Sequence, residues 1–294
     1  MTSQFHIVDV FAERPYSGNP LAVVISANPL AEQTMQQIAL ETNYSETTFV
    51  ASQAEGDGGY RVRVYTPARE IAFAGHPILG TAWVLRHHID PGAKDSVQLN
   101  LAIGKVSVTF EPAGSENEIC WFNAPAMELG ERCDAAEIAG ALGLTVGELA
   151  DDLPIQQVSA GTAAMIVPVR SREALRRAML NLDAYAPLAA RGLPPLTYLF
   201  CREPKDSQND LRARFFFEAR GVREDPATGN GAAFLGAYLL EHNPPPGGSL
   251  SLRIEQGDEM HRPSLVRVRG HRREVGYQIS VGGRVIPVAR GELM

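Results

Sequence analysis

The stretch that decides the fold is Phe73-Ala74-Gly75-His76-Pro77-Ile78-Leu79-Gly80-Thr81-Ala82-Trp83-Val84-Leu85. It starts with small residues, and Pro77 stands near the first helical position, where its missing N–H costs nothing. After the proline nearly every residue is apolar or small, whereas a surface helix shows a single apolar stripe. The helix is far shorter than the roughly 20 residues of a membrane span. It is therefore predicted to be enclosed by protein.

The start of this predicted helix is suited to binding an anion. The first N–H groups of a helix have no partner within it and lie at the positive end of its dipole. Here they belong to Gly75, His76 and Ile78. A carboxylate or a similar group is the ligand that such an end favours.

The same design occurs a second time, in Thr228-Gly229-Asn230-Gly231-Ala232-Ala233-Phe234-Leu235-Gly236-Ala237-Tyr238-Leu239-Leu240. Two upstream segments also repeat, and the offset between copies grows slowly from 143 through 151 to 154 residues. The matched pairs, from the N-terminal one onward, are Gly18–Ile25 with Gly161–Val167, Arg61–Tyr65 with Arg212–Phe216, and Gly75 with Gly229. Three matches in one order predict a duplicated fold.

Strand patterns alternate with helical patterns in both copies, which predicts an α/β (α+β) fold of two pseudo-repeated domains. The polar segment Glu111–Glu118 holds Pro and Gly and is the candidate boundary. The first repeat then covers residues 1–118 and the second covers 119–282, with the C-terminal strand 283–294 a candidate to return to the first. Each repeat is expected to curl a sheet around its apolar helix. An active-site cleft is expected between them, where the two helix starts would face each other.

Composition excludes several classes of function. The chain has 294 residues, 45% of them apolar, and a formal charge of −7 without a basic run, which argues against nucleic acid as a partner. The three cysteines, Cys120, Cys133 and Cys201, form no Cys-x-x-Cys pair and are interpreted as reduced thiols. The N-terminus lacks a signal-peptide pattern. A cytoplasmic protein that binds no membrane is expected.

No motif for a metal or an organic cofactor is found. His87 and His88 are adjacent and do not share a helix face. The sequence also lacks a Gly-x-Gly-x-x-Gly turn, a Walker loop and a Gly-x-Ser-x-Gly elbow. We therefore expect no cofactor and no metal, and proton transfer is the chemistry that remains.

Glu46 is the first candidate for that chemistry. With an offset near 151, the segment Ser45–Val50 matches Leu196–Cys201, so Glu46 stands opposite an apolar or hydroxyl residue. Burial of a carboxyl group in an apolar strand raises its pKa, and such a group can exchange protons near neutral pH. The alternative is a glutamate on an edge strand that faces water.

Asp225 and His76 are the other two candidates. Asp225 precedes Pro226 just before the second helix, and its alternative interpretation is a turn or capping residue. His76 lies at the start of the first helix, where it could donate to a bound anion or relay a proton. A capping side chain is the alternative for His76.

At these residues the sequence resembles the phenazine-biosynthesis PhzF-like family, within the diaminopimelate-epimerase fold. The matching segments, which span most of the chain, are Asp9-Val10-Phe11, Gly18-Asn19-Pro20, Asn43-Tyr44-Ser45-Glu46-Thr47, Phe73-Ala74-Gly75-His76-Pro77, Glu224-Asp225-Pro226-Ala227-Thr228-Gly229, Gln256-Gly257 and Arg262-Pro263-Ser264. The Phe-Ala-Gly-His-Pro and Glu-Asp-Pro-x-Thr-Gly segments are the most specific of these.

The resemblance implies a homodimer that isomerises trans-2,3-dihydro-3-hydroxyanthranilate without a cofactor. It implies that Glu46 moves a proton between ring carbons and that His76 and Asp225 line the same pocket. The backbone N–H groups around Gly75 and around Gly229-Asn230 would hold the substrate carboxylate. Ser45 and Gly231, which flank these residues in the matched segments, complete the predicted substrate-binding set.

Two departures from the family pattern concern the substrate. Asn230-Gly231 stands where the family commonly has Ser or a similar small residue, and His261 replaces the usual glycine before Arg-Pro-Ser. A larger amide at position 230 would narrow the pocket or contact another substrate group. The substrate of the phenazine branch therefore does not carry over.

Three hypotheses follow. The first is an isomerase in which Glu46 moves a proton on a small carboxylate substrate. The second is an epimerase or racemase of a hydroxy or amino acid that uses Glu46 with Asp225 or His76 on the opposite face. Racemisation by two thiols is disfavoured, because no cysteine lies at either helix start. The third is a small-acid binding protein without turnover.

Overall fold

The chain forms two compact units. The computed structural model describes residues 3–92, 95–115, 117–194, 196–217 and 224–293. Unit 1 comprises Met1–Asn123 and Gly282–Met294, and unit 2 comprises Ala124–Val281. Residues 1, 2, 93, 94, 116, 195, 218–223 and 294 of the predicted ranges lie outside the described part. In the described segments no helix has the length and apolar character needed to cross a membrane.

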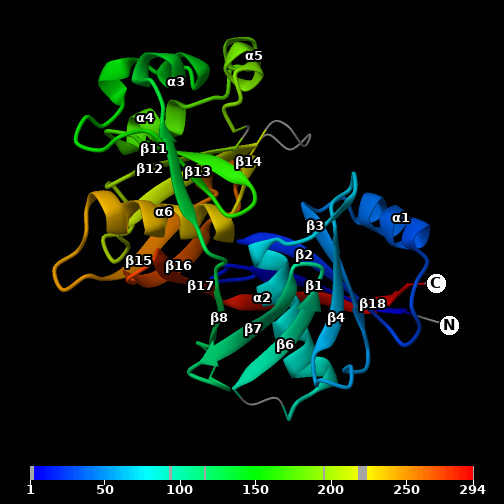
Figure 1. Ribbon diagram of the computed structural model, residues 1–294. Coiled ribbons are helices and arrows are strands. Elements are labelled where there is room, and N and C mark those ends of the chain that lie inside the picture. The colour runs from blue at the N-terminus through cyan, green and yellow to red at the C-terminus, as the bar shows by residue number, and fades with distance from the viewer. Residues whose placement is uncertain (1–2, 93–94, 116, 195, 218–223, 294) are drawn as a thin grey trace. The chain divides into compact units, whose positions relative to one another are not determined.

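Unit 1 is a curled sheet around helix α2 (Gly75–Val84). Its strands are β1 (Ser3–Val10), β2 (Asn19–Ser26), β3 (Glu46–Ala51), β4 (Tyr60–Tyr65), β5 (Glu70–Ile71), β6 (Ser96–Leu101), β7 (Gly104–Glu111), β8 (Ile119–Asn123) and β18 (Val285–Leu293). They pair in the order β18-β1-β2-β3-β4-β6-β7-β8, and β5 pairs with the far end of β4. Figure 1 shows β18, in red, beside β1, in blue.

Helix α2 confirms the prediction of an enclosed apolar helix. Every residue of α2 except Trp83 is buried, and the helix contacts six strands of its sheet as well as β18. At Gly80 an added Cβ would lie only 3.0 Å from the Val10 side chain, so the helix approaches β1 closely because a glycine stands there. The chain continues as a π-helical turn, η1 (Leu85–Ile89), which the apolar pattern did not indicate.

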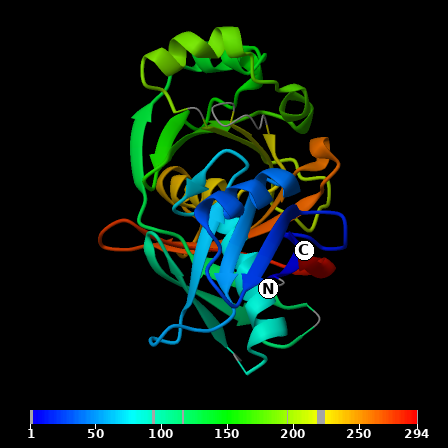
Figure 2. The ribbon, with the colours of Figure 1, turned by 90° about the vertical axis from the view of Figure 1, so that its right-hand side faces the viewer.

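Helix α1 (Glu32–Thr42) covers the other face of this sheet (Figure 2). Its buried Met35 and Ala39 belong to one apolar cluster with Val24, Phe49 and Tyr65 of the strands. Asn43, which the sequence suggests as the stop of this helix, adopts the left-handed conformation at φ 54° and caps it. This is a usual way for a helix to end.

Unit 2 repeats the plan around helix α6 (Gly229–His242). Its strands are β9 (Glu128–Arg132), β10 (Gln156–Ser159), β11 (Ala163–Pro168), β12 (Leu196–Cys201), β13 (Leu211–Phe217), β14 (Glu224–Asp225), β15 (Ser249–Gln256), β16 (Ser264–Arg272) and most of β17 (Tyr277–Gly283). They pair in the order β9-β10-β11-β12-β13-β15-β16, with β14 on β13. The α/β prediction of two repeated, curled sheets around central helices is confirmed.

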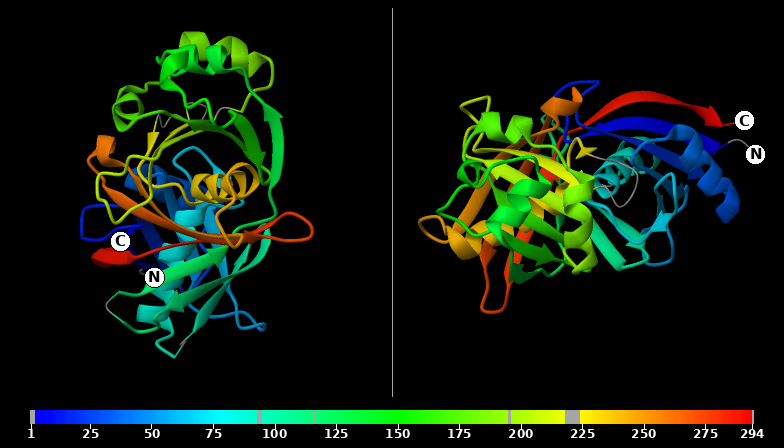
Figure 3. Two further views of the ribbon diagram at one scale, coloured as in Figure 1. Left: turned by 90° about the vertical axis from the view of Figure 1, so that its left-hand side faces the viewer. Right: turned by 90° about the horizontal axis from the view of Figure 1, so that it is seen from above.

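Three further helices of unit 2 cover the face of the sheet opposite α6 (Figure 3). They are α3 (Ala135–Ala141), α4 (Arg172–Arg177) and α5 (Leu182–Ala190). Unit 2 also contains the short 3₁₀ turns η2 (Val146–Glu148) and η4 (Asp258–Met260). Ser171 caps α4 by accepting a hydrogen bond from the Ala174 N–H. Helix α5 contains Pro187, which weakens a helical pattern in the sequence.

The ladders of the two units establish which residues are equivalent. In unit 1, Arg63 of β4 forms a two-point ion pair with Glu70 of β5; in unit 2, Arg214 of β13 does the same with Glu224 of β14. In unit 1, Val64 of β4 pairs with Thr48 of β3 and with Ile71 of β5. In unit 2, Phe215 of β13 pairs in the same way with Tyr198 of β12 and with Asp225 of β14.

This register corrects the expected match at Glu46. The offset is 151 on β4 but 150 on β3, so the counterpart of Glu46 is Leu196 and not Thr197. Thr197 corresponds to Thr47. The offset changes because the connection between the two paired strands is one residue longer in unit 2, from Tyr198 to Phe215, than in unit 1, from Thr48 to Val64.

Candidate functional site

Glu46 is the first residue of β3 and lies in the interior of the sheet. Strand β3 pairs with β2 on one side and with β4 on the other, so the alternative of an edge strand is wrong. The Glu46 side chain is only 16% exposed. A carboxyl group is thus placed at the end of a central strand, largely shielded from water.

His76 is the second residue of α2 and the neighbour of Glu46. Its Nδ1 lies 3.6 Å from Glu46 Oε2, too long for a hydrogen bond. Burial lowers the pKa of His76 from 6.5 to about 3, against a smaller opposite effect of the Pro20 carbonyl. The imidazole is therefore neutral near pH 7 and brings no positive charge to Glu46. Within the described residues, His76 Nε2 is buried without a hydrogen-bond partner.

The start of α2 has no side-chain cap among the described residues. Its N-cap residue is Ala74. The first turn contains no acidic residue. Gly75 is buried there, and Ser45, partly buried, directly precedes β3. Unit 1 thus brings Glu46, His76, Gly75 and Ser45 to one region, at the ends of β3 and α2.

Asp225 is the second residue of β14 and pairs with Phe215 of β13. It is buried, and its Oδ2 accepts a hydrogen bond of 2.5 Å from the Thr228 hydroxyl. Its backbone carbonyl accepts one of 2.8 Å from Gln256 Nε2. The Asp225 side chain is therefore part of a buried polar network at the start of α6. It does not lie in an exposed turn.

The start of α6 also lacks a side-chain cap. Thr228 is the N-cap residue, yet its hydroxyl bonds Asp225 and makes no capping bond to the helix. Gly229 and Gly231 are buried and Asn230 is partly buried. A Cβ at Gly231 would overlap the Tyr198 ring, so only glycine allows this close approach. Asp225, Gly229, Asn230 and Gly231 form the second group of predicted residues, in unit 2.

Sequence reasoning missed the residues that surround Asp225. Gln256, Thr228 and Tyr198 are all hydrogen-bonded to one another or to Asp225. The available signal was the pair Gln256-Gly257, which belongs to the matched segments but received no role.

A cavity of about 240 Å³ opens beside α1 but contains none of the predicted residues. Its wall is mostly apolar, from residues such as Leu30, Met35 and Phe49. The arginines that line it are paired, Arg61 with Glu55 and Arg63 with Glu70. In the described part of the chain, no cluster of three or more His, Cys, Asp or Glu residues could hold a metal ion.

Comparison with known proteins shows which family the chain belongs to. The family model described as phenazine biosynthesis-like protein matches residues 8–291. The chain is 33% identical over 273 residues to trans-2,3-dihydro-3-hydroxyanthranilate isomerase of Pseudomonas aeruginosa, covering 90% of each protein.

Two solved structures share the fold over nearly their whole length. A phenazine biosynthesis protein of the PhzF family from Bacillus anthracis superposes with a TM-score of 0.90 at 26% identity, covering 100% of this chain and 99% of the other. A protein of Pseudomonas aeruginosa described as a predicted epimerase gives 0.80 at 32% identity, covering 99% of each. The chain therefore belongs to the phenazine biosynthesis-like (PhzF) family of isomerases.

Proposed function

We propose that this protein is a cofactor-independent isomerase that moves a proton from one carbon to another on a small carboxylate substrate. Glu46 abstracts the proton and returns it at the second carbon. The observation that carries the proposal is the placement of Glu46 beside a neutral His76. A carboxylate that is shielded from water and has no ion pair with its histidine neighbour is suited to exchanging a proton with carbon.

The carboxylate of the substrate would bind at the helix starts. Both α2 and α6 begin without a side-chain cap or an acidic first turn in the described residues, and such ends favour anions. We propose that Asp225 and His76 each orient polar groups of the substrate. The name of the Pseudomonas isomerase supports a cyclic amino-hydroxy acid as the first substrate to test.

The experiment is deuterium incorporation from D₂O into trans-2,3-dihydro-3-hydroxyanthranilate, followed by NMR. The wild-type protein is expected to place deuterium at the carbon that receives the proton. Glu46→Gln keeps the size of the side chain but cannot take up a proton, so the rate is expected to fall by about 10²–10⁴-fold. Calorimetric binding of the substrate should persist in this variant.

Glu41→Gln is the matched control, because Glu41 is an exposed glutamate at the end of α1. It should react at the wild-type rate. Undiminished exchange in Glu46→Gln would refute the role of Glu46. A wild-type protein that leaves this compound unchanged would refute the substrate, and a panel of small cyclic carboxylates would then be assayed in the same way.

Epimerisation is the second candidate, supported by the 32% identical structure described as a predicted epimerase. In that reaction the proton returns to the same carbon from the opposite face, and Asp225 or His76 would act opposite Glu46. Loss of optical rotation together with deuterium at the original carbon would identify it. A third candidate, binding without turnover, requires saturable binding and no exchange of any ligand proton.

A further inference from the structure

The hydrogen bonds of Gln256 determine how its amide is oriented. Gln256 Nε2 lies 2.8 Å from the Asp225 carbonyl oxygen, which can only accept. Gln256 Oε1 lies 3.3 Å from the Thr228 backbone N–H, which can only donate. Because each backbone partner has one role, the nitrogen and the oxygen cannot be exchanged. The Tyr198 hydroxyl donates to the same oxygen at 3.3 Å.

This orientation determines the direction of the next hydrogen bond. Gln256 Nε2 also lies 3.1 Å from Thr228 Oγ1 and can only donate to it. The single hydroxyl proton of Thr228 is then available for Asp225 Oδ2, at 2.5 Å. A donated hydrogen bond favours the ionised carboxylate over the protonated acid. The chain from Gln256 through Thr228 to Asp225 therefore has one direction.

The fold itself does not require this network, as unit 1 demonstrates. By the ladder register, the counterpart of Asp225 is Ile71. The N-cap residue that corresponds to Thr228 is Ala74. On the neighbouring parallel strands, Arg212 pairs with Glu255 in unit 2, and its counterpart Arg61 pairs with Asn100 in unit 1. Gln256 follows Glu255 and Leu101 follows Asn100, so Gln256 corresponds to Leu101. Three apolar side chains thus hold the same places in unit 1. The polar set of unit 2 needs a reason other than folding.

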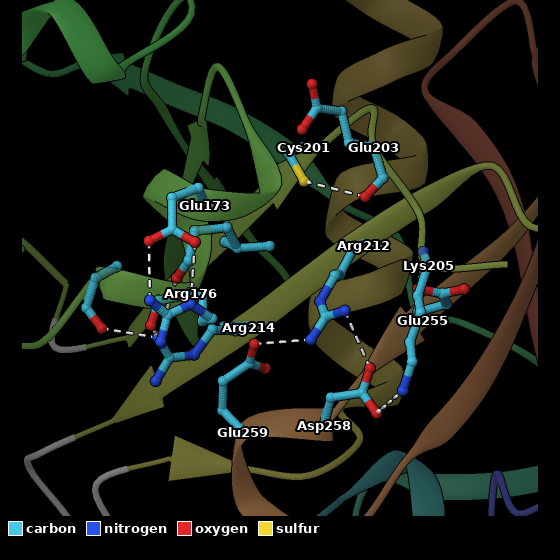
Figure 4. A network of polar contacts seen from close by, with 12 residues as sticks. Glu173, Arg176, Cys201, Glu203, Lys205, Arg212, Arg214, Glu255, Asp258 and Glu259 are labelled. Carbon is cyan, nitrogen blue, oxygen red and sulfur yellow. Dashed lines mark hydrogen bonds and ion pairs between the residues drawn. The ribbon is translucent and has the colours of Figure 1, made fainter.

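Gln256 is held firmly from both sides along the chain. Glu255 accepts backbone N–H bonds from Lys205 and Asp206, at 2.7 and 2.8 Å. On the other side, Arg212 bonds both Asp258 and Glu259, at 3.1 and 2.7 Å (Figure 4). Gln256 is only 2% exposed. A side chain anchored in this way can fix the geometry of its partners.

We propose that Gln256 is a positioning residue that acts through Thr228 to hold Asp225 as an oriented, ionised carboxylate during the reaction. This inference rests on the proposed function, in which Asp225 contacts the substrate. Among the described residues, the charged and titratable neighbours of Asp225 include Tyr198 on β12, which interacts with it electrostatically, and Glu224, the preceding residue of β14, which is paired with Arg214 on β13. The Thr228 hydroxyl is a direct donor to the Asp225 carboxylate, at 2.5 Å from Oδ2.

The test measures the titration of Asp225 directly. The ¹³C resonance of its carboxyl carbon is followed against pH in labelled full-length protein and assigned by its absence in Asp225→Asn. Thr228→Val removes the donor without changing the shape of the side chain, and the titration midpoint should rise by about one pH unit. Gln256→Leu should raise it by at least half as much. In the double variant the shift should equal that of Thr228→Val, because the two residues form one chain.

Two controls separate positioning from general destabilisation. Thr228→Ser keeps the hydroxyl and should titrate like wild type. Gln156→Leu removes another buried amide of unit 2, which donates to the Gly130 carbonyl, and should leave Asp225 unchanged. The acidic limb of the kcat/KM profile should shift with the NMR midpoint in each variant.

Unchanged midpoints in both Thr228→Val and Gln256→Leu would overturn the inference, as would an equal shift in Gln156→Leu. The NMR titration requires no turnover. A protein that shows the predicted shifts but converts none of the carboxylates assayed would therefore refute the proposed function and leave this network in place.

Discussion

At the scale of a single residue, Gly231 is a position where no side chain fits without displacing its neighbour. An added Cβ would lie 2.7 Å from Cε2 of Tyr198, and that ring is fully buried and hydrogen-bonded to Gln256. Gly231→Ala is expected to lower the free energy of unfolding by about 1–3 kcal/mol through overpacking. Urea denaturation measures it.

Gly140 provides the matched control for that substitution. It lies within α3, and a Cβ there would meet no atom within 4 Å. Gly140→Ala should raise the stability by about 0.4–1 kcal/mol, because the unfolded chain loses conformational freedom. Equal effects of the two substitutions would show that the Tyr198 contact is not responsible.

At the scale of elements, one ion pair fastens each two-residue strand that precedes a central helix. Arg214, with its side chain 7% exposed, bonds Glu224 and also donates to the Leu175, Arg176 and Ala178 carbonyls at the C-terminal end of α4. In unit 1, Arg63 forms the equivalent ion pair with Glu70, and each of these side chains is 34% exposed. Removing one partner of a buried pair leaves an unpaired charge and several unpaired carbonyls.

Arg214→Gln should therefore destabilise the protein by about 3–5 kcal/mol, and Arg63→Gln by about 1 kcal/mol or less. The two substitutions are chemically identical and fall on equivalent places of the duplicated fold. Thermal unfolding followed by circular dichroism compares them. Similar losses for both variants would mean that burial does not set the strength of these pairs.

At the scale of the whole molecule, buried histidines make the fold sensitive to acid. Burial lowers the pKa of His76 to about 3 and, with the neighbouring His88 and Arg290, that of His6 to about 4. The unfolded chain then binds more protons than the folded one below pH 6.5, so stability is complete above that pH and falls as the pH drops toward 3. For His76 the loss between pH 7.5 and 5 is about 2 kcal/mol.

Urea denaturation at pH 7.5, 6.5 and 5 measures this dependence. His76→Gln does not titrate in this range, so its stability should depend less steeply on pH than that of wild type, by about the same 2 kcal/mol. Parallel slopes for the two proteins would show that His76 is not the group responsible.

The enclosed helices α2 and α6 were predictable because their evidence is local. An all-round apolar run beginning with small residues can only be stable inside a protein, and both stretches carry that pattern over consecutive positions. Glu46 was recognisable for a similar reason, since a single carboxylate interrupts an apolar strand. The duplication supplied the comparison that made it stand out.

The network around Asp225 was decided by tertiary structure. Asp225 and Gln256 are separated by 31 residues along the chain, and each is an ordinary polar residue in its own neighbourhood. Tertiary structure also decided the strand register that matches Glu46 with Leu196 and the ion pair of Arg214 with Glu224. The sequence alone determined which segments must be buried, because burial follows from the solvation of nearby side chains. Only the folded chain decided strand register and the direction of hydrogen bonds, because these depend on groups that meet in space and not in sequence.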